Sequence, residues 1–285
     1  MARIAVLQFE PVFGDVAGNI AATVRLISEA AAQGAELVVL PELCNSGYMF
    51  SSETELADLA EVVGEGPASL AWTAAAARLG VHVVAGLTEE DDGRYFNTAV
   101  MVGPGGVIAK YRKVHLWDAE ARWFTPGDLG FPVADTHLGR VGMLVCYDGW
   151  FPESYRSLVL QGADIVCVPT NWVPIPGQAE GQQAMATILS MASAHSNGLV
   201  VAAADRTGTE RGQKFIGQSL IVSHTGWPLA GPAAEDGTAV LTADVDVAAI
   251  RASRTWNDNN DPVLDRRPET YTTGHGHPSH TTADA

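Results

Sequence analysis

Short apolar runs rich in valine and isoleucine alternate along this chain with alanine-rich stretches that suit helices. The run Leu37–Leu40 is apolar at every position, a pattern typical of a strand that is buried on both faces. Such strands need a layer of helices or a second sheet on each side, so the alternation predicts an α/β fold built in layers. The predicted strands are Ile4–Phe9, Leu37–Leu40, Val81–Leu87, Thr98–Val102, Val107–Tyr111, Val141–Cys146, Ile165–Pro169, Leu199–Ala203, Ser219–Val222 and Ala239–Asp244. The predicted helices are Ala17–Gln33, Pro67–Leu79, Pro152–Gln161, Glu180–His195 and Val247–Ser253.

The segment Thr98–Ile108 places a Gly-Pro-Gly-Gly turn between two apolar runs, which predicts an antiparallel hairpin and therefore mixed sheets. No linker or internal repeat divides the chain, so we predict one domain over residues 1–270. The segment 271–285 lacks apolar periodicity and is predicted to be a flexible C-terminal tail. Its histidines are expected to be solvated rather than to bind a metal ion, and no metal site is predicted elsewhere.

The charge and the cysteine content of the chain exclude several classes of protein. The formal net charge is −16, whereas binding to nucleic acid or to an anionic membrane needs clustered lysine and arginine. The sequence shows neither a long uncharged apolar segment nor a signal-peptide pattern, so we expect a cytoplasmic protein. Its 3 cysteines match neither a disulfide framework nor a zinc site. Cys44 and Cys167 are predicted to be buried packing residues.

Three chemically active side chains follow predicted strands. Glu42 comes directly after the strand Leu37–Leu40, Lys113 follows the basic end of the hairpin, and Cys146 ends a strand that leads into a helix. In open α/β sheets, ligands bind beyond the carboxyl ends of the strands. Each position alone also fits a structural role: a surface glutamate, a solvated basic face or a small buried thiol.

Together these three residues provide what thiol chemistry requires. A thiol needs a base to become a thiolate, and a neighbouring cation lowers its pKa, so Glu42 can accept the proton of Cys146 beside Lys113. On an amide carbonyl, Lys113 and a backbone N–H can hold the oxyanion, and Glu42 can pass its proton to the departing ammonia. His115 or His195 is an alternative base, although the sequence identifies no Asn or Asp partner for such a cysteine–histidine site.

At these residues the sequence closely resembles the nitrilase superfamily of carbon–nitrogen hydrolases. Leu40–Leu43 resembles the family's glutamate block, Tyr111–Leu116 its lysine block and Cys146–Glu153 its cysteine block. The likeness extends from Ile4 to about Tyr271. It implies a four-layer αββα sandwich and subunits that pair into homodimers or higher homo-oligomers, and we expect no cofactor.

The resemblance also supplies a second glutamate. The segment Ala119–Asp128 looks like the family block in which a glutamate precedes an aromatic-x-Pro-Gly turn, and this likeness assigns the position to Glu120. The implied role of Glu120 is to hydrogen-bond Lys113 and to hold the substrate amide in line with Cys146. The alternative is an exposed helical glutamate.

The residues after the nucleophile favour the amidase side of the family. Many amidase and carbamoylase branches carry Tyr-Asp at this point, as Tyr147–Asp148 does, whereas true nitrilases commonly carry Trp-Glu. Gly149–Trp150 offers no arginine to hold a carboxylate, which disfavours a D-carbamoyl-amino-acid hydrolase. We expect Asp148, Glu153 and Arg156 to form a structural ion-pair cluster beneath the nucleophile.

We therefore predict an amidase that hydrolyses small aliphatic amides to carboxylic acid and ammonia through a cysteine thioester. Tyr48, Tyr147 and Trp172 are the predicted substrate-binding walls, because they adjoin the motifs or a strand end. Trp117 and Trp150 are not selected. The alternatives are a nitrilase or an N-carbamoyl amidohydrolase that uses the same residues, and a non-catalytic binding scaffold of the same fold.

Overall fold

The structure, a computed structural model, describes residues 1–177, 179 and 182–271 of the chain. Within these residues, two six-stranded sheets form the centre of the molecule. The first sheet has the order β14 (Ala239–Val245), β1 (Ala2–Gln8), β2 (Leu37–Val39), β3 (His82–Asp91), β4 (Arg94–Gly103) and β5 (Gly106–Arg112). The second has the order β13 (Pro228–Ala230), β12 (Leu220–Val222), β9 (Val200–Asp205), β8 (Ile165–Thr170), β7 (Gly139–Met143) and β6 (Val133–Thr136). A separate ribbon pairs β10 (Thr209–Glu210) with β11 (Gln213–Lys214).

Both sheets combine parallel and antiparallel pairs, which confirms the predicted mixed sheets. Strands β1, β2 and β3 are parallel, as are β7, β8 and β9, whereas β4, β5, β14, β6 and β12 pair antiparallel to their neighbours. The parallel strands of each sheet therefore end at one edge, and the residues that follow them gather there.

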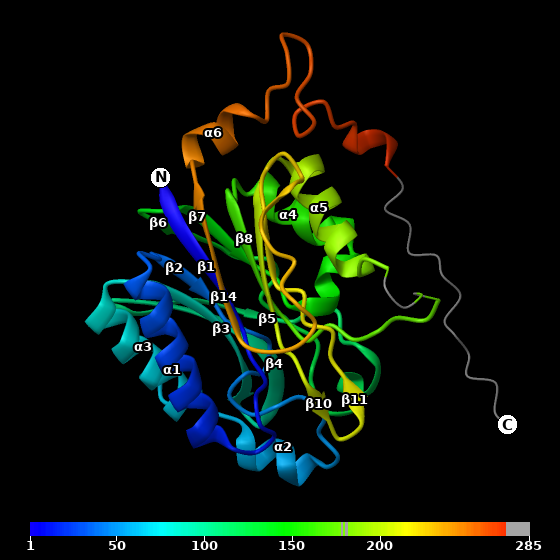
Figure 1. The fold of residues 1–285 in the computed structure, drawn as a ribbon. Coiled ribbons are helices and arrows are strands. Elements are labelled where there is room, and N and C mark those ends of the chain that lie inside the picture. The colour runs from blue at the N-terminus through cyan, green and yellow to red at the C-terminus, as the bar shows by residue number, and fades with distance from the viewer. Residues whose placement is uncertain (178, 180–181, 272–285) are drawn as a thin grey trace, which may run out of the picture.

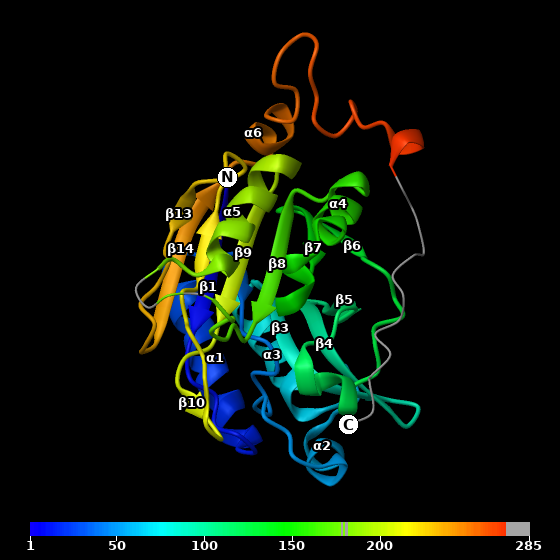
Figure 2. The same cartoon turned by 90° about the vertical axis from the view of Figure 1, so that its right-hand side faces the viewer.

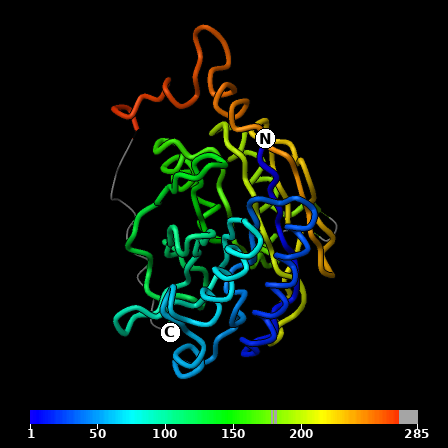
Figure 3. The backbone as a smooth tube through the Cα atoms, turned by 90° about the vertical axis from the view of Figure 1, so that its left-hand side faces the viewer, coloured from blue at the N-terminus to red at the C-terminus, as the bar shows by residue number. Residues whose placement is uncertain are grey.

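Helices cover the outer face of each sheet, so the fold is the predicted four-layer αββα sandwich (Figure 1). Helices α1 (Val16–Ala32) and α3 (Pro67–Leu79) cover the first sheet, on the side that faces the viewer in Figure 3. Helices α4 (Pro152–Leu160) and α5 (Met185–Asn197) cover the second sheet (Figure 2). The short helices α2 (Glu53–Leu59) and α6 (Val247–Ala252) lie at opposite ends of the sandwich.

The two cores explain why the strand runs are apolar at successive positions. In β1, Ala5 and Leu7 belong to the core between the first sheet and its helices. Ile4 and Val6 alternate with them and belong to the core between the two sheets. Trp72 of α3 packs into the first of these cores. A strand buried on both faces requires this continuous apolar pattern.

Some element boundaries differ from the predictions. Helix α2 and edge strand β6 were not predicted, because both are short and have few buried apolar side chains. Helix α5 begins at Met185 rather than at Glu180, which lies outside the described residues. Strand β7 ends at Met143, before Cys146.

Two further expectations concern the tail and membranes. Apart from Tyr271, the predicted tail lies outside the described residues, so its boundary with the domain remains a prediction. Among the described residues, no helix is both long and apolar enough to cross a membrane.

Candidate active site

Glu42 lies just beyond β2, at the edge where the parallel strands of the first sheet end. The turn that carries it packs closely on Gly86 of β3: the Gly86 N–H donates to the Pro41 carbonyl (3.1 Å), and the Gly86 carbonyl accepts from the Cys44 N–H (3.0 Å). A Cβ atom on Gly86 would lie 2.4 Å from the Cα of Glu42. Only glycine permits this approach, which fixes the wholly buried Glu42 at the sheet edge.

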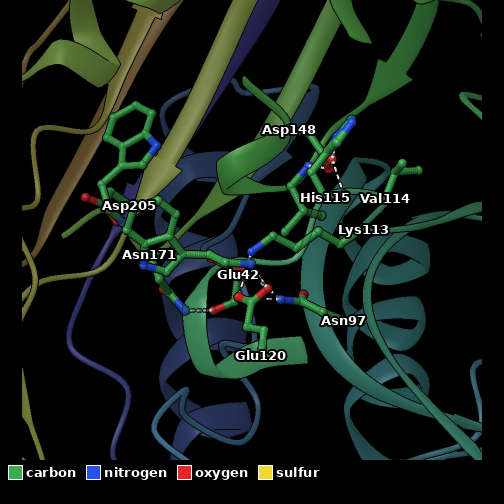
Figure 4. A network of polar contacts seen from close by, with 12 residues as sticks. Glu42, Asn97, Lys113, Val114, His115, Glu120, Asp148, Asn171 and Asp205 are labelled. Atoms are coloured by element: carbon green, nitrogen blue, oxygen red, sulfur yellow. Dashed lines mark hydrogen bonds and ion pairs between the residues drawn. The ribbon is translucent and has the colours of Figure 1, made fainter. Parts of the chain in front are cut away.

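Lys113 follows β5, and its ammonium group binds two carboxylates at once. Its Nζ lies 2.7 Å from Oε1 of Glu42 and 2.7 Å from Oε1 of Glu120, and all three residues are buried (Figure 4). Glu120 belongs to a 3-10 helix, Asp118–Arg122, and its second oxygen accepts a 3.0 Å hydrogen bond from the N–H of Trp117. Glu120 is thus a buried partner of the lysine and not an exposed helical residue.

Cys146 lies beyond β7 and opens a second 3-10 helix, Cys146–Trp150. Its φ of 44° is in the left-handed region, which residues with a side chain rarely adopt. Backbone conformations of this kind cost about 1–3 kcal/mol and occur at functional sites. The turn holds the thiol at the sheet edge close to backbone N–H groups, as in the nucleophile elbow of other hydrolases. Cys146 is 7% exposed and lines a pocket, so a small molecule can reach it.

Asp148 ties the turn that carries Cys146 to the segment that carries Lys113. Its buried carboxylate accepts hydrogen bonds from the Tyr111 hydroxyl (2.7 Å) and the Val145 N–H (3.1 Å). It also lies 3.0 Å from the backbone nitrogen and 2.8 Å from Nδ1 of His115. One carboxylate therefore joins the end of β5 to the end of β7.

The predicted ion-pair cluster of Asp148, Glu153 and Arg156 does not form. Arg156 instead donates to the backbone carbonyls of Ser196 (3.0 Å) and Pro262 (3.4 Å). Asp148 is already occupied by four donors from the cysteine and lysine segments, which is the physical reason for the difference.

The two histidines proposed as alternative bases lie in different surroundings. His115 has Asp148 as the acidic partner that the sequence did not identify, and its ring stacks on Phe151 with centroids 3.6 Å apart. His195 lies on α5 and stacks on Trp256. The charged groups that act on the thiol of Cys146 are Glu42 and Lys113, which favours the carboxylate as its base.

Burial and mutual charge shift the pKa values of this group. Burial, opposed by Lys113 and reinforced by Glu120, raises the pKa of Glu42 to about 7. Burial disfavours the ammonium form of Lys113, but the charges of Glu120 and Glu42 outweigh burial and raise the pKa of Lys113. Burial and the charge of Glu42 raise the pKa of the Cys146 thiol, and Lys113 opposes them. A protonated thiol therefore lies near a carboxyl group that titrates near neutral pH.

The other two thiols are enclosed by the core. Cys44 and Cys167 are wholly buried, and burial raises the pKa of both thiols. Cys44 donates a hydrogen bond from its sulfur to the Gly86 carbonyl (3.4 Å), and Cys167 lies within β8. Their surroundings fit the packing role predicted for them.

Two small pockets lead to the charged residues and share Trp117 and Val173. The first has a volume of about 20 Å³, little more than one water molecule needs, and is lined by Cys146, Trp117, Tyr147, Trp150, Asn171, Trp172, Val173 and Ile175. The second has a volume of about 50 Å³, and its lining includes Tyr48, Glu120 and Trp117. Of the predicted walls, Tyr147 and Trp172 line the first pocket and Tyr48 lines the second.

The sequence analysis did not select several residues of this site. Trp117 lies between the two pockets, three positions before Glu120. Asn171 follows β8 at the same sheet edge, a signal that the sequence did contain, and donates a 3.0 Å hydrogen bond to the Glu42 carbonyl. Asn97 of β4 donates to Glu42 (2.6 Å), and no pattern in the sequence indicated this contact (Figure 4). Among the described residues, no cluster of His, Cys, Asp or Glu is arranged to hold a metal ion.

The fold and this site agree with one enzyme family. The family model described as carbon-nitrogen hydrolase matches residues 3–255. The chain therefore belongs to this family, the nitrilase superfamily, which confirms the resemblance seen in the sequence. It is a hydrolase that acts on non-peptide carbon–nitrogen bonds.

Individual relatives have several different names. The chain is 41% identical over 272 residues to a nitrilase from Pyrococcus abyssi, which covers 95% of this chain and 99% of the relative. It is 32% identical to an N-carbamoylputrescine amidase from Arabidopsis thaliana, with 90% of each chain covered. Among solved structures, an amidase from Nesterenkonia sp. AN1 matches with a TM-score of 0.76, 28% identity and coverage of 94% and 95%. A carbon-nitrogen hydrolase from Helicobacter pylori G27 matches with a TM-score of 0.84, 32% identity and coverage of 95% and 96%.

Proposed function

We propose that the protein is an amidase that hydrolyses small aliphatic amides to carboxylic acid and ammonia through a thioester on Cys146. The observation that carries the proposal is the buried Lys113 ammonium, which lies 2.7 Å from both Glu42 and Glu120. These charges act on the Cys146 thiol. A scaffold without catalytic activity would have no use for three buried charges, because burying them costs free energy that packing alone does not require.

The first half of the reaction forms the thioester. Glu42 takes the proton from Cys146, and the thiolate attacks the amide carbonyl carbon, which forms a C–S bond and an oxyanion. Lys113 has a third N–H beyond those directed at the two glutamates, and this N–H and a backbone N–H of the turn hold the oxyanion. Glu42 then gives its proton to the amide nitrogen, the C–N bond breaks, and ammonia leaves.

The second half hydrolyses the thioester. Glu42, again ionised, takes a proton from water, and the resulting hydroxide attacks the thioester carbonyl. The C–S bond breaks, the sulfur of Cys146 is protonated, and the carboxylic acid leaves. A carboxyl group with a pKa of about 7 suits both proton transfers at neutral pH.

The pocket supports a small and uncharged substrate. Cys146 lies in a pocket of about 20 Å³ with three tryptophans and a tyrosine among its walls. In the described part of the chain, neither this pocket nor the adjoining one has an arginine or lysine in its lining that would hold a substrate carboxylate. The amidase from Nesterenkonia sp. AN1 has been described with the acetamide moiety of fluoroacetamide added covalently at its active-site cysteine, and that chemistry supports a thiol-bound intermediate here.

A nitrilase is the second candidate, because the relative from Pyrococcus abyssi carries that name at 41% identity. A nitrile first gives a thioimidate, which must be hydrated before ammonia leaves, whereas an amide reaches the tetrahedral species directly. Tyr147–Asp148 after the nucleophile and a second glutamate able to orient a planar amide support the amide as the preferred substrate.

The test is kcat/KM for propionamide against propionitrile on one preparation, measured by ammonia release. We expect propionamide to be favoured by at least about tenfold, which corresponds to about 1.4 kcal/mol in the transition state. Cys146→Ala should abolish turnover, while the matched variants Cys44→Ala and Cys167→Ala should keep most of it. Equal or higher efficiency on the nitrile would replace the amidase assignment, and full activity of Cys146→Ala would remove the thioester mechanism.

We also propose that two copies of the chain pair near the end of α5. Trp256 is 57% exposed and stacks on His195 of α5, and Gly226 packs against the same histidine beside Trp227, which is 69% exposed. Exposed indoles gathered in this way are typical of an interface. Light scattering should give twice the chain mass of 30.0 kDa, and Trp256→Glu should reduce it to one chain. Leu70→Glu on the exposed side of α3 is the control that should leave the mass unchanged.

The cellular location forms part of the same proposal. Cys44, Cys146 and Cys167 are free thiols, which suits a reducing compartment, so we place the enzyme in the cytoplasm. Cell fractionation with an antibody tests this location, and recovery in an extracytoplasmic fraction would contradict it.

A further inference from the structure

Asn97 contacts all three charged residues of the site. Its side-chain Nδ2 donates a 2.6 Å hydrogen bond to Oε1 of Glu42 and lies 3.4 Å from Oε1 of Glu120. Its backbone carbonyl accepts a 2.8 Å hydrogen bond from the N–H of Lys113. The residue is buried in β4, directly beside the charged group (Figure 4).

The arrangement leaves one oxygen of Glu42 without a partner. Lys113 and Asn97 both bind Oε1 of Glu42, and both also reach Oε1 of Glu120. The buried Oε2 of Glu42 has no hydrogen-bond partner. Two donors therefore fix the rotation of the carboxylate about its long axis and reserve one oxygen for a proton.

We propose that Asn97 is a positioning residue that holds Glu42 through Oε1, so that Oε2 exchanges protons with Cys146 and with the departing ammonia. The inference rests on the proposed amidase function, because it assigns the oxygen that performs the proton transfers described above. Asn97 touches neither the substrate nor the thiol in this scheme, and it acts through Glu42 alone.

The chemistry of the amide group fixes its orientation. If the amide were rotated, its carbonyl oxygen would face two carboxylates, and the repulsion excludes that arrangement. An N–H that donates to the ionised carboxylate favours the ionised form, and Asn97 accordingly lowers the pKa of Glu42 against the larger effect of burial. Asn97 therefore keeps the base available at neutral pH as well as holding its rotation.

The neighbouring Thr98 provides a matched control. Its hydroxyl donates a 2.5 Å hydrogen bond to Glu89, which also binds Arg112, so Thr98 serves a buried charge cluster outside the site. Thr98→Val and Asn97→Leu each remove one side-chain donor from adjacent positions of the same strand. Their effects on folding should be comparable, and their effects on proton transfer should differ.

The experiment measures kcat, KM and the pH profile of kcat/KM for propionamide in the wild type, Asn97→Leu and Thr98→Val. We expect Asn97→Leu to move the acid limb of the profile upward by about one pH unit, since a hydrogen bond to a charged group has about that effect. Its kcat should fall about tenfold or more with little change in KM. The rate of Cys146 alkylation by iodoacetamide should show the same shift, and Thr98→Val should keep the wild-type profile.

An acid limb that stays in place in Asn97→Leu, in an enzyme with active wild type, would overturn the proposal while leaving the amidase function intact. Wild-type protein without amidase activity would instead refute the proposed function. If Asn97→Leu does not fold, Asn97→Ser and Asn97→Gln carry the same test. In that case the acid limb should move in the serine variant and return toward the wild-type position in the glutamine variant, which keeps the amide, and an unmoved limb in the serine variant would overturn the proposal.

Discussion

The hydroxyl of Tyr111 donates a 2.7 Å hydrogen bond to the carboxylate of Asp148, and this contact joins the two sheets of the sandwich. Tyr111 belongs to β5 in the first sheet, two positions before Lys113, whereas Asp148 follows β7 of the second sheet, two positions after Cys146. Burial and the nearby charge of Asp148 raise the pKa of Tyr111, so its hydroxyl remains a donor. The distance between the lysine and the cysteine thus depends on one buried hydrogen bond.

The first prediction follows from that contact. Asp148→Asn replaces an acceptor oxygen by an NH₂ group that faces other donors, and an unsatisfied buried group costs about 1–3 kcal/mol. We expect a lower melting temperature and a loss of up to about 100-fold in kcat/KM, the scale of a misplaced catalytic group. Asp164→Asn is the control, because Asp164 is equally buried and binds Arg251 at the opposite end of the second sheet. A similar loss of activity in both variants would show that Asp148 acts through stability alone.

The second prediction concerns pH. The ionised form of Glu42 takes the thiol proton, and burial first, opposed by Lys113, raises the pKa of Glu42 to about 7. Below that pH most of the enzyme carries a neutral Glu42, so kcat/KM should fall about tenfold per pH unit as the pH decreases. The profile is measured with propionamide, alongside a melting curve at each pH to exclude unfolding. A limb at pH 4 to 5, the range of an ordinary glutamate, would contradict the assignment.

The third prediction tests the shape of the cation. Lys113→Arg keeps the charge, but a flat, forked guanidinium does not fit where a compact ammonium lies 2.7 Å from two carboxylates. We expect a loss of about 10²- to 10³-fold in kcat/KM, close to that of Lys113→Ala and comparable with the loss of an oxyanion donor. Near-wild-type activity in the arginine variant would mean that position 113 supplies only a diffuse positive field.

The fourth prediction tests the packing under Glu42. Gly86→Ala places a methyl group 2.4 Å from the Cα of Glu42, against backbone that cannot move aside. We expect a loss of about 1–3 kcal/mol in the free energy of unfolding together with reduced kcat, measured by urea titration and turnover. Gly105→Ala in the β4–β5 hairpin is the control, because a Cβ atom there meets nothing within 4 Å. Equal stability of the two alanine variants would contradict the close approach.

The sequence predicted much of the fold because the physical signal is local. Continuous apolar runs such as Leu37–Val39 indicate burial on both faces, and the alternation with helices predicts layers. The short elements α2 and β6 escaped prediction because seven and four residues contain too little periodicity to separate them from loops. The pairing of the two sheets depended on the family resemblance, since no single segment encodes it.

The site was predictable where a residue follows a strand, and less so where contacts cross sheets. Glu42, Lys113 and Cys146 follow the ends of strands, which is a signal in the chain itself. Asn97 looks like any polar residue within a strand, and its role depends on where β4 lies in the folded sheet. The expected pairing of Asp148 with Arg156 was wrong, because nearness in sequence does not determine which donors a buried carboxylate meets.

The proposed reaction needs both sheets at once. Glu42 and Lys113 follow strands of the first sheet, whereas Cys146 and Asn171 follow strands of the second. Proteins open in part at a lower free energy than they unfold, and a slight separation of the layers removes the base from the thiol while each sheet remains intact. Heating should therefore stop turnover before it melts secondary structure, and an enzyme cooled within that interval should recover its activity.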